Sequence, residues 1–119
     1  MSTQRPDPSG FLPLSNLSFH VLLALGDRRC HGYAIGKDVE KRSGGRLNPT
    51  TGGLYQALKR LDEDGLVEHA PAAADRSTDA RRQYFKLTTL GRRVAALEAQ
   101  RLHELVADAR AKKLFTGSV

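Results

Sequence analysis

Apolar residues recur at intervals of three and four near the start of the chain, the spacing that places side chains on one face of an α-helix. A helix is predicted over residues 15–25, and two such stripes run over residues 14–25. They are Leu14, Leu17, Val21 and Leu25, and Phe19, Leu22 and Leu23. A helix with two apolar faces is buried on more than one side. In so small a protein, we expect the second side to contact a partner chain.

Two further helices are predicted after a turn, and together they form a helix-turn-helix. The first opens at His31 and Gly32, buries Ile35 and Val39, and stops at residues 44–45. The second is predicted to begin with Asn48 as its N-cap and Pro49 as its first residue, and to end at residues 64–65. Its inner stripe is Leu54, Ala57, Leu58 and Leu61.

The pattern then changes from helical spacing to alternation. Residues 66–70 and 83–87 alternate apolar and polar side chains around a polar loop, which predicts a β-hairpin. Thr88 can cap a last helix over residues 89–114. Its apolar positions are Leu90, Val94, Leu97, Leu102, Leu105, Val106 and Ala109. Such a helix is about 38 Å long, too long for this chain alone to cover, so we expect it to pack against a partner.

The order of elements predicts a mainly α fold with a small β-hairpin: a winged helix-turn-helix domain followed by a long C-terminal dimerisation helix. We expect a flexible N-terminal arm over residues 1–13 and the winged domain over residues 14–88. The dimerisation helix is expected over residues 89–115 and a tail over residues 116–119.

The 119-residue chain has a net charge of +6 and an isoelectric point near 9.9. This balance favours an acidic partner, with nucleic acid first and an anionic membrane second, although a merely soluble basic protein has the same composition. Cys30 is the only cysteine, which excludes an internal disulfide and a cysteine zinc cluster and fits a cytoplasmic setting. No apolar run approaches transmembrane length.

No arrangement typical of catalysis or metal binding stands out. The four histidines lack the helical spacing of a metal site, and His31 is interpreted as a helix-start or packing residue. We therefore expect no enzyme, no cofactor and no metal.

Polar side chains cover the face of residues 50–63 that lies opposite the inner leucines. They are Thr51, Gly52, Tyr55, Gln56, Lys59 and Glu63. A recognition helix reads bases with residues near its N-terminus, and these side chains can bond base edges or phosphates. Gly52 and Gly53 cost helix stability there. We expect them to let the backbone approach phosphate, although tight packing against another helix also explains them.

Basic residues gather in the predicted wing. Arg76 lies near its tip, and Arg81 and Arg82 lie at its end. Arginines at these places suit phosphates or a narrow minor groove. Asp75 and Asp79 dilute the charge, so an ordinary solvated hairpin is the alternative.

Several motifs together resemble the PadR family of bacterial transcriptional regulators. The stretch HGYAIGKDVEKRSGGRLNPTTGGLYQALKRLDEDGLVEH is followed by RRQYFKLTTLGRR, and the resemblance runs over about residues 17–93. It rests on His-Gly-Tyr, Gly-x-Leu-Tyr, Leu-Lys-Arg-Leu, Asp-Gly-Leu-Val and Tyr-x-Lys-Leu-Thr in this order. One helix after the wing resembles the short subfamily. The resemblance implies a homodimer that binds palindromic double-stranded DNA, usually as a repressor.

The resemblance also implies functional residues. The DNA-facing set is Thr50, Thr51, Gly52, Tyr55 and Lys59, joined by Gln56, by Arg81 and Arg82 in the wing, and by Tyr33 at a phosphate or in the helix-turn-helix core. The dimerisation set is Leu22, Leu23, Val94, Leu97, Leu102, Leu105 and Val106. A small apolar effector is expected at Phe19, Leu22, Leu102 and Leu105. The family often has Ser or Thr where this chain has Gly53.

Two alternatives remain open at this point. The chain can be a small-molecule sensing module whose dimer interface captures a hydrophobic or planar compound. It can also be a winged-helix adaptor for protein interactions, which the acidic run of residues 62–64 favours slightly.

Overall fold

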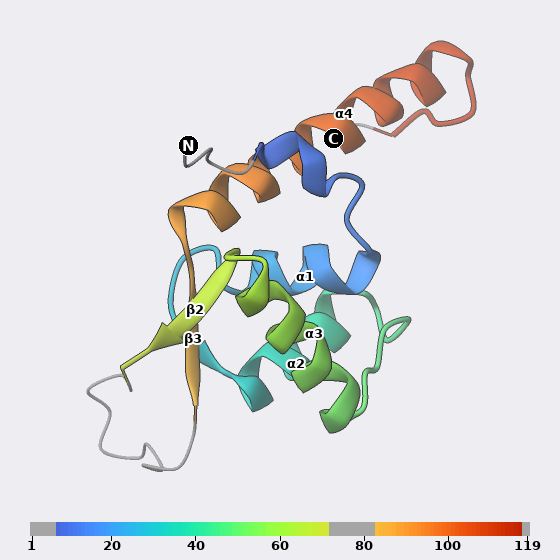
Figure 1. Cartoon of the computed structure of the whole chain (residues 1–119). Coiled ribbons are helices and arrows are strands. Elements are labelled where there is room, and N and C mark those ends of the chain that lie inside the picture. Colours follow the sequence, from blue (N-terminus) through green and yellow to red (C-terminus); the bar gives the residue numbers. More distant parts are fainter. Residues whose placement is uncertain (1–6, 72–82, 118–119) are drawn as a thin grey trace, which may run out of the picture.

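Three short helices, a small antiparallel sheet and one long helix make up the fold of the computed structural model, which describes residues 7–71 and 83–117 (Figure 1). The elements are η1 (Pro8–Phe11), α1 (Asn16–Ala24), β1 (Cys30–His31), α2 (Gly32–Arg42), α3 (Thr51–Glu63), β2 (Val67–Ala70), β3 (Tyr84–Leu87) and α4 (Thr89–Ala111). The predicted mainly α, winged-helix fold is confirmed.

The core lies where α1, α2 and α3 meet, and the sheet and the first part of α4 close it. Its buried apolar residues are Val21, Leu22, Ala24, Leu25, Ile35, Val39, Leu54, Leu58, Leu61, Leu66, Val67, Phe85 and Val94. The inner stripes predicted for α2 and α3 supply five of these residues, because only one face of each of these helices is apolar.

The sheet has three strands in the order β1–β3–β2, and both pairs are antiparallel. His69 on β2 lies opposite Phe85 on β3, and Cys30 on β1 lies opposite the same Phe85. The predicted hairpin is therefore joined by a third strand that the sequence pattern missed. A two-residue strand is too short to show alternation, and only pairing with a distant segment reveals it.

Each α-helix begins at a side chain that accepts a hydrogen bond from a free backbone N–H of the first turn. These caps are Ser15, His31, Thr50 and Thr88. The predicted start of α3 is wrong, because Thr50 rather than Asn48 is the N-cap: its Oγ1 accepts from the Gly53 N–H at 3.0 Å. His31 caps α2 through Nδ1, 3.2 Å from the Ala34 nitrogen, as the helix-start interpretation predicted. The last helix ends at Ala111, three residues before the predicted end.

The N-terminal segment does not match the expected flexible arm from residue 7 onward. Pro8–Phe11 forms a 3-10 turn that lies across α4 (Figure 1). Phe11, Leu12 and Leu14 pack against the core from the same side. Residues 1–6 lie outside the described part of the chain.

A buried carboxylate anchors this segment. Glu98 on α4 is only 1% exposed. It accepts hydrogen bonds from the Leu14 backbone N–H at 2.9 Å and from both Nε and Nη2 of Arg101. The Arg101 guanidinium holds the pKa of Glu98 below its ordinary value; burial opposes this shift, and the Leu14 N–H adds to it. Through its hydrogen bond from the Leu14 N–H, Glu98 therefore ties the start of the winged domain to the middle of α4.

We predict that Glu98 makes stability depend on pH. A folded-state pKa below the ordinary 4.5 means that the charged group stabilises the fold above that pH, and that this contribution is lost as pH falls through the folded-state pKa. The free energy of unfolding should therefore fall more steeply in the wild type than in Glu98→Gln as the pH falls below the ordinary value of 4.5. At neutral pH, Glu98→Gln should lower it by about 1–3 kcal/mol.

Urea denaturation followed by circular dichroism measures both effects. Glu104→Gln is the matched control, because Glu104 is exposed on the same helix and should keep the wild-type pH dependence. Parallel pH profiles of the wild type and Glu98→Gln would contradict the assignment.

Candidate nucleic-acid interface

The rotation of α3 about its axis is set by its buried leucines. Leu54, Leu58 and Leu61 are at most 4% exposed. The opposite face is open to solvent, and it carries the predicted recognition residues Thr51, Gly52, Tyr55, Gln56 and Lys59. The N-cap Thr50 is exposed as well. These six predicted positions therefore form one continuous polar surface at the start and along the outer side of α3.

Tyr55 is held in place by two neighbouring elements. Its ring meets the edge of Phe85 on β3, with centroids 6.5 Å apart, and 38% of the residue stays exposed. Its phenol end lies directly on Gly32 at the start of α2, where an added Cβ would come within 2.6 Å of Tyr55 Cζ. Gly32 therefore lets α2 and the Tyr55 ring come together. The sequence pattern did not reveal this role, although glycine at the first position of a helix was a signal.

The two glycines at the start of α3 do not pack against another helix. A Cβ at Gly52 would meet nothing within 4 Å, and one at Gly53 would meet only the hydroxyl of its own cap Thr50, at 3.1 Å. The packing explanation for these glycines is therefore wrong. Their effect is to leave the first turn of α3 without side-chain cover.

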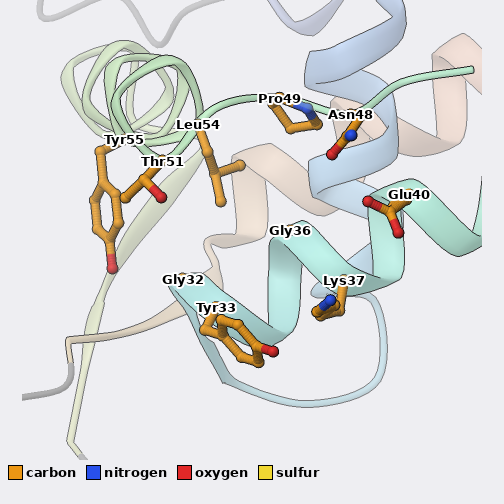
Figure 2. Close-up of a pocket in the computed structure, with 10 residues that line it drawn as sticks. All are labelled: Gly32, Tyr33, Gly36, Lys37, Glu40, Asn48, Pro49, Thr51, Leu54 and Tyr55. Atoms are coloured by element: carbon orange, nitrogen blue, oxygen red, sulfur yellow. The ribbon is translucent and has the colours of Figure 1, made fainter. Parts of the chain in front are cut away.

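A cleft of about 240 Å³ separates the first turns of α2 and α3 (Figure 2). Tyr33 and Lys37 line it from α2, and Thr51 and Tyr55 line it from α3. Tyr33 is 66% exposed, so its side chain belongs to this surface and not to the helix-turn-helix core. Figure 2 shows Tyr33 beside Lys37 at the α2 wall, and Thr51 with Tyr55 at the α3 wall.

The wing side of α3 is also hollowed. Tyr55, Lys59 and Asp62 of α3 face His69 and Phe85 across a small pocket. The His69 and Phe85 rings lie 4.7 Å apart, and His69 Nε2 lies 4.0 Å from Asp62 Oδ2. Arg81 and Arg82 lie outside the described residues, as do Arg76 and the rest of the wing tip. The prediction for these arginines stays a prediction.

The residues predicted for dimerisation divide into two groups. Leu22 and Val94 are 0% exposed and belong to the core, so their assignment to a dimer interface, and that of Leu22 to an effector site, is wrong. In contrast, three other residues of the predicted dimerisation set are exposed: Leu23, Leu97 and Leu105, at 39%, 40% and 51%. In α1 the buried face combines Val21 and Leu25 of one predicted stripe with Leu22 of the other, while Leu23 of that second stripe is exposed.

An apolar hollow lies between α1 and α4. Phe19 and Leu102, both expected at an effector site, line it together with Val106, and Ala96 and Ala99 complete its apolar walls. Leu105 does not line the hollow.

Within residues 7–71 and 83–117, no group of three His, Cys, Asp or Glu side chains could hold a metal ion. The same ranges hold no helix long and apolar enough to cross a membrane. Burial raises the pKa of the Cys30 thiol, which disfavours the reactive thiolate.

Comparison with known proteins decides the family. The Transcriptional regulator PadR-like family matches residues 21–97, which include the whole helix-turn-helix and the start of α4. The chain belongs to this family. The resemblance read from the sequence motifs is thereby confirmed.

Solved structures of transcriptional regulators share the fold. A PadR family transcription regulator from Clostridium difficile superposes with a TM-score of 0.68 at 23% identity, over 82% of this chain and 97% of that one. A transcriptional regulator from Clostridium thermocellum gives a TM-score of 0.60 at 19% identity, over 91% of this chain and 92% of that one.

A curated relative is closer in sequence. An uncharacterised 37.1 kDa protein in a transposon of Streptomyces fradiae is 40% identical over 85 residues, or 71% of this chain. The match spans only 22% of that protein's length.

We predict that Gly32 is needed for the position of Tyr55. Gly32→Ala should lower the free energy of unfolding by about 1–3 kcal/mol, because the added methyl group overlaps the phenol. In a Tyr55→Ala background the same substitution should be neutral or stabilising, by up to about 1 kcal/mol, since Ala is the better helix former. Denaturant unfolding of the four proteins forms a double-mutant cycle. Equal costs of Gly32→Ala in both backgrounds would show that Tyr55 is not what Gly32 accommodates.

Proposed function

We propose that the protein is a sequence-specific DNA-binding transcriptional regulator that binds a palindromic operator as a homodimer and acts as a repressor. The observation that carries this proposal is the outer face of α3, which is polar, exposed and uncovered at its first turn in a PadR-like chain.

The α3 helix is proposed to enter the major groove. A recognition helix contacts base edges mainly through its N-terminal residues, and Thr51, Tyr55 and Gln56 occupy this part of the outer face. Their hydroxyl and amide groups both donate and accept hydrogen bonds. Lys59 lies one turn further along and supplies a cation for a phosphate or for a guanine edge. Gly52 leaves backbone N–H groups accessible to a phosphate that approaches the helix start.

The wing supplies the second contact in this proposal. Strand β2 follows the C-terminal end of α3 and pairs with β3, and this hairpin lies beside α3 (Figure 1). Arg81 and Arg82 precede β3, at the point where a wing meets the adjacent backbone or minor groove.

Dimer formation is proposed through α1 and α4. The exposed Leu23, Leu97 and Leu105 and the apolar hollow at Phe19 and Leu102 lie on these two helices. Exposed apolar side chains and an apolar hollow each favour an interaction surface on these helices. A two-fold pair would place its two α3 helices on half-sites about one helical turn, ~10 bp, apart.

A small apolar effector is the second candidate function, and the same hollow favours it. Its walls come from Phe19, Leu102 and Val106, with His103 and Gln100 as polar neighbours. A compound that fills the hollow changes DNA binding only if it binds the free and DNA-bound states with different affinity.

Selection of bound fragments from random duplex DNA tests the main proposal. We expect an inverted repeat, and light scattering of the complex should give two protein chains per fragment. Lys59→Ala and Gln56→Ala should each weaken operator binding by about 1–3 kcal/mol, that is, roughly 5- to 150-fold. Lys112→Ala, at the far end of α4, is the control and should leave operator binding unchanged. Weak association without sequence preference would favour the adaptor alternative instead.

Gly52→Ala separates stability from recognition. The added methyl group meets no neighbour among the described residues, so the substitution should leave the fold intact and stabilise α3 by up to about 1 kcal/mol. Operator affinity should nevertheless fall, because the methyl group projects from the surface that approaches DNA. Thermal unfolding and fluorescence anisotropy measure the two effects, and a variant that is both more stable and as tight as the wild type would exclude close approach at Gly52.

A further inference from the structure

The contact between α4 and its own winged domain ends at a charged residue. Gly91, Val94 and Glu98 are the buried residues of this helix, and within the described residues no position of α4 after Glu98 is buried. The remaining turns, up to Ala111, extend for about 20 Å beyond the carboxylate, and the far end of the helix projects beyond the other helices (Figure 1). Glu98 is therefore the outer end of the contact.

The inner end of the contact is Gly91. An added Cβ at this position would overlap the Leu66 backbone, so α4 touches the segment between α3 and β2 with no side chain between them. Gly91 and the core residue Val94 lie only about 4.5 Å apart along the helix axis, whereas Gly91 and Glu98 lie about 10 Å apart. Glu98 therefore contributes most to the direction in which α4 leaves the domain.

The hydrogen bonds of Glu98 lead to the start of α1. Its Oε2 accepts from the Leu14 N–H at 2.9 Å and from Arg101 Nη2 at 3.1 Å, and its Oε1 accepts from Arg101 Nε. Leu14 directly precedes Ser15, the N-cap of α1, whose Oγ accepts from the Ser18 N–H. A hydrogen bond depends on angle as well as distance, so this contact permits less movement of α4 than apolar packing would.

A buried charge is a costly way to hold two helices together. Well-packed apolar residues often replace a buried ion pair without loss of stability. The carboxylate of Glu98, only 1% exposed, is therefore poorly explained by stability alone. What its directional bonds add is a defined angle between α4 and the winged domain.

We propose that Glu98 is a positioning residue for DNA binding: through Leu14 and Arg101 it fixes the angle between α4 and the winged domain, and thereby the half-site spacing that the homodimer accepts. This inference rests on the proposed function, in which α4 joins two protomers. In such a pair, the separation and relative rotation of the two α3 helices depend on the angle at which each α4 leaves its domain. One added base pair moves a half-site by about 3.4 Å and rotates it by roughly 35°, which a pair held at one angle cannot follow.

The test is operator binding by the full chain as a function of spacing. Inverted repeats are compared at the selected spacing and with one base pair added or removed. The wild type should lose about tenfold or more affinity at each change, because DNA or protein must deform to engage both half-sites. In Glu98→Gln and Arg101→Gln the same change should cost about threefold or less, since a less preorganised pair adapts to either spacing.

Two controls accompany this comparison. A duplex with a single half-site should bind both variants as tightly as the wild type, because neither residue lies on α3. Glu104→Gln, at an exposed position of the same helix, should keep the wild-type spacing profile. Arg101 is only partly buried, so Arg101→Gln decides the question if Glu98→Gln does not fold.

A second measurement does not depend on DNA. Spin labels at Arg60→Cys, an exposed position of α3, report the distance between the two α3 helices by double electron–electron resonance in a Cys30→Ser background. We expect one narrow distance distribution with Glu98 and Arg101 intact, and a broader one in Glu98→Gln and in Arg101→Gln.

The outcomes separate this inference from the function on which it rests. Wild-type spacing profiles or unbroadened distance distributions in the variants would overturn the positioning role and leave the regulator proposal standing. An equal loss of affinity for the single half-site and the full operator would also overturn it, because Glu98 would then support only the fold of the winged domain. Failure of the wild type to prefer any inverted repeat would overturn the proposed function first and the spacing role with it.

Discussion

Burial of one leucine stripe on α3 is the constraint on which the rest of the interface depends. Leu54, Leu58 and Leu61 fill the space between α1, α2 and the sheet, and they fix both the position and the rotation of the helix. Every polar residue of the outer face is exposed as a consequence. Burial of such side chains is worth about 1.5–3 kcal/mol each, so the three leucines together outweigh the roughly 1 kcal/mol of helix propensity given up at each of Gly52 and Gly53. The core therefore permits a helix start that is poor in local stability and open at its first turn.

The C-terminal end of α3 is joined closely to the start of α4. Thr88 donates its backbone N–H to the Leu66 carbonyl at 3.2 Å, and its hydroxyl bonds the Gly65 carbonyl while it caps α4. Gly91 lies so close to the Leu66 backbone that no side chain fits between them. The end of α3, the start of the wing and the start of α4 therefore meet at these contacts.

A second connection runs from the middle of α4 to the N-terminal segment through Glu98. The carboxylate replaces its lost hydration with the Leu14 N–H and the Arg101 guanidinium, which is how a buried charge is tolerated. The two connections place α4 firmly against the winged domain near its start, whereas its far end projects beyond the other helices (Figure 1).

Periodicity alone predicted the helices, the hairpin, the inner face of α3 and its polar outer face, because regular spacing makes each of these a local property. The assignment of apolar residues to the core or to the surface was decided by tertiary structure: Leu22 and Val94 are enclosed, while the nearby Leu23 and Leu97 are exposed. Sequence spacing shows that a helix has two apolar faces but not which one its own domain covers. The strand β1, the burial of Glu98 and the contact of Gly32 with Tyr55 each join residues far apart in the chain, so only the folded arrangement determined them.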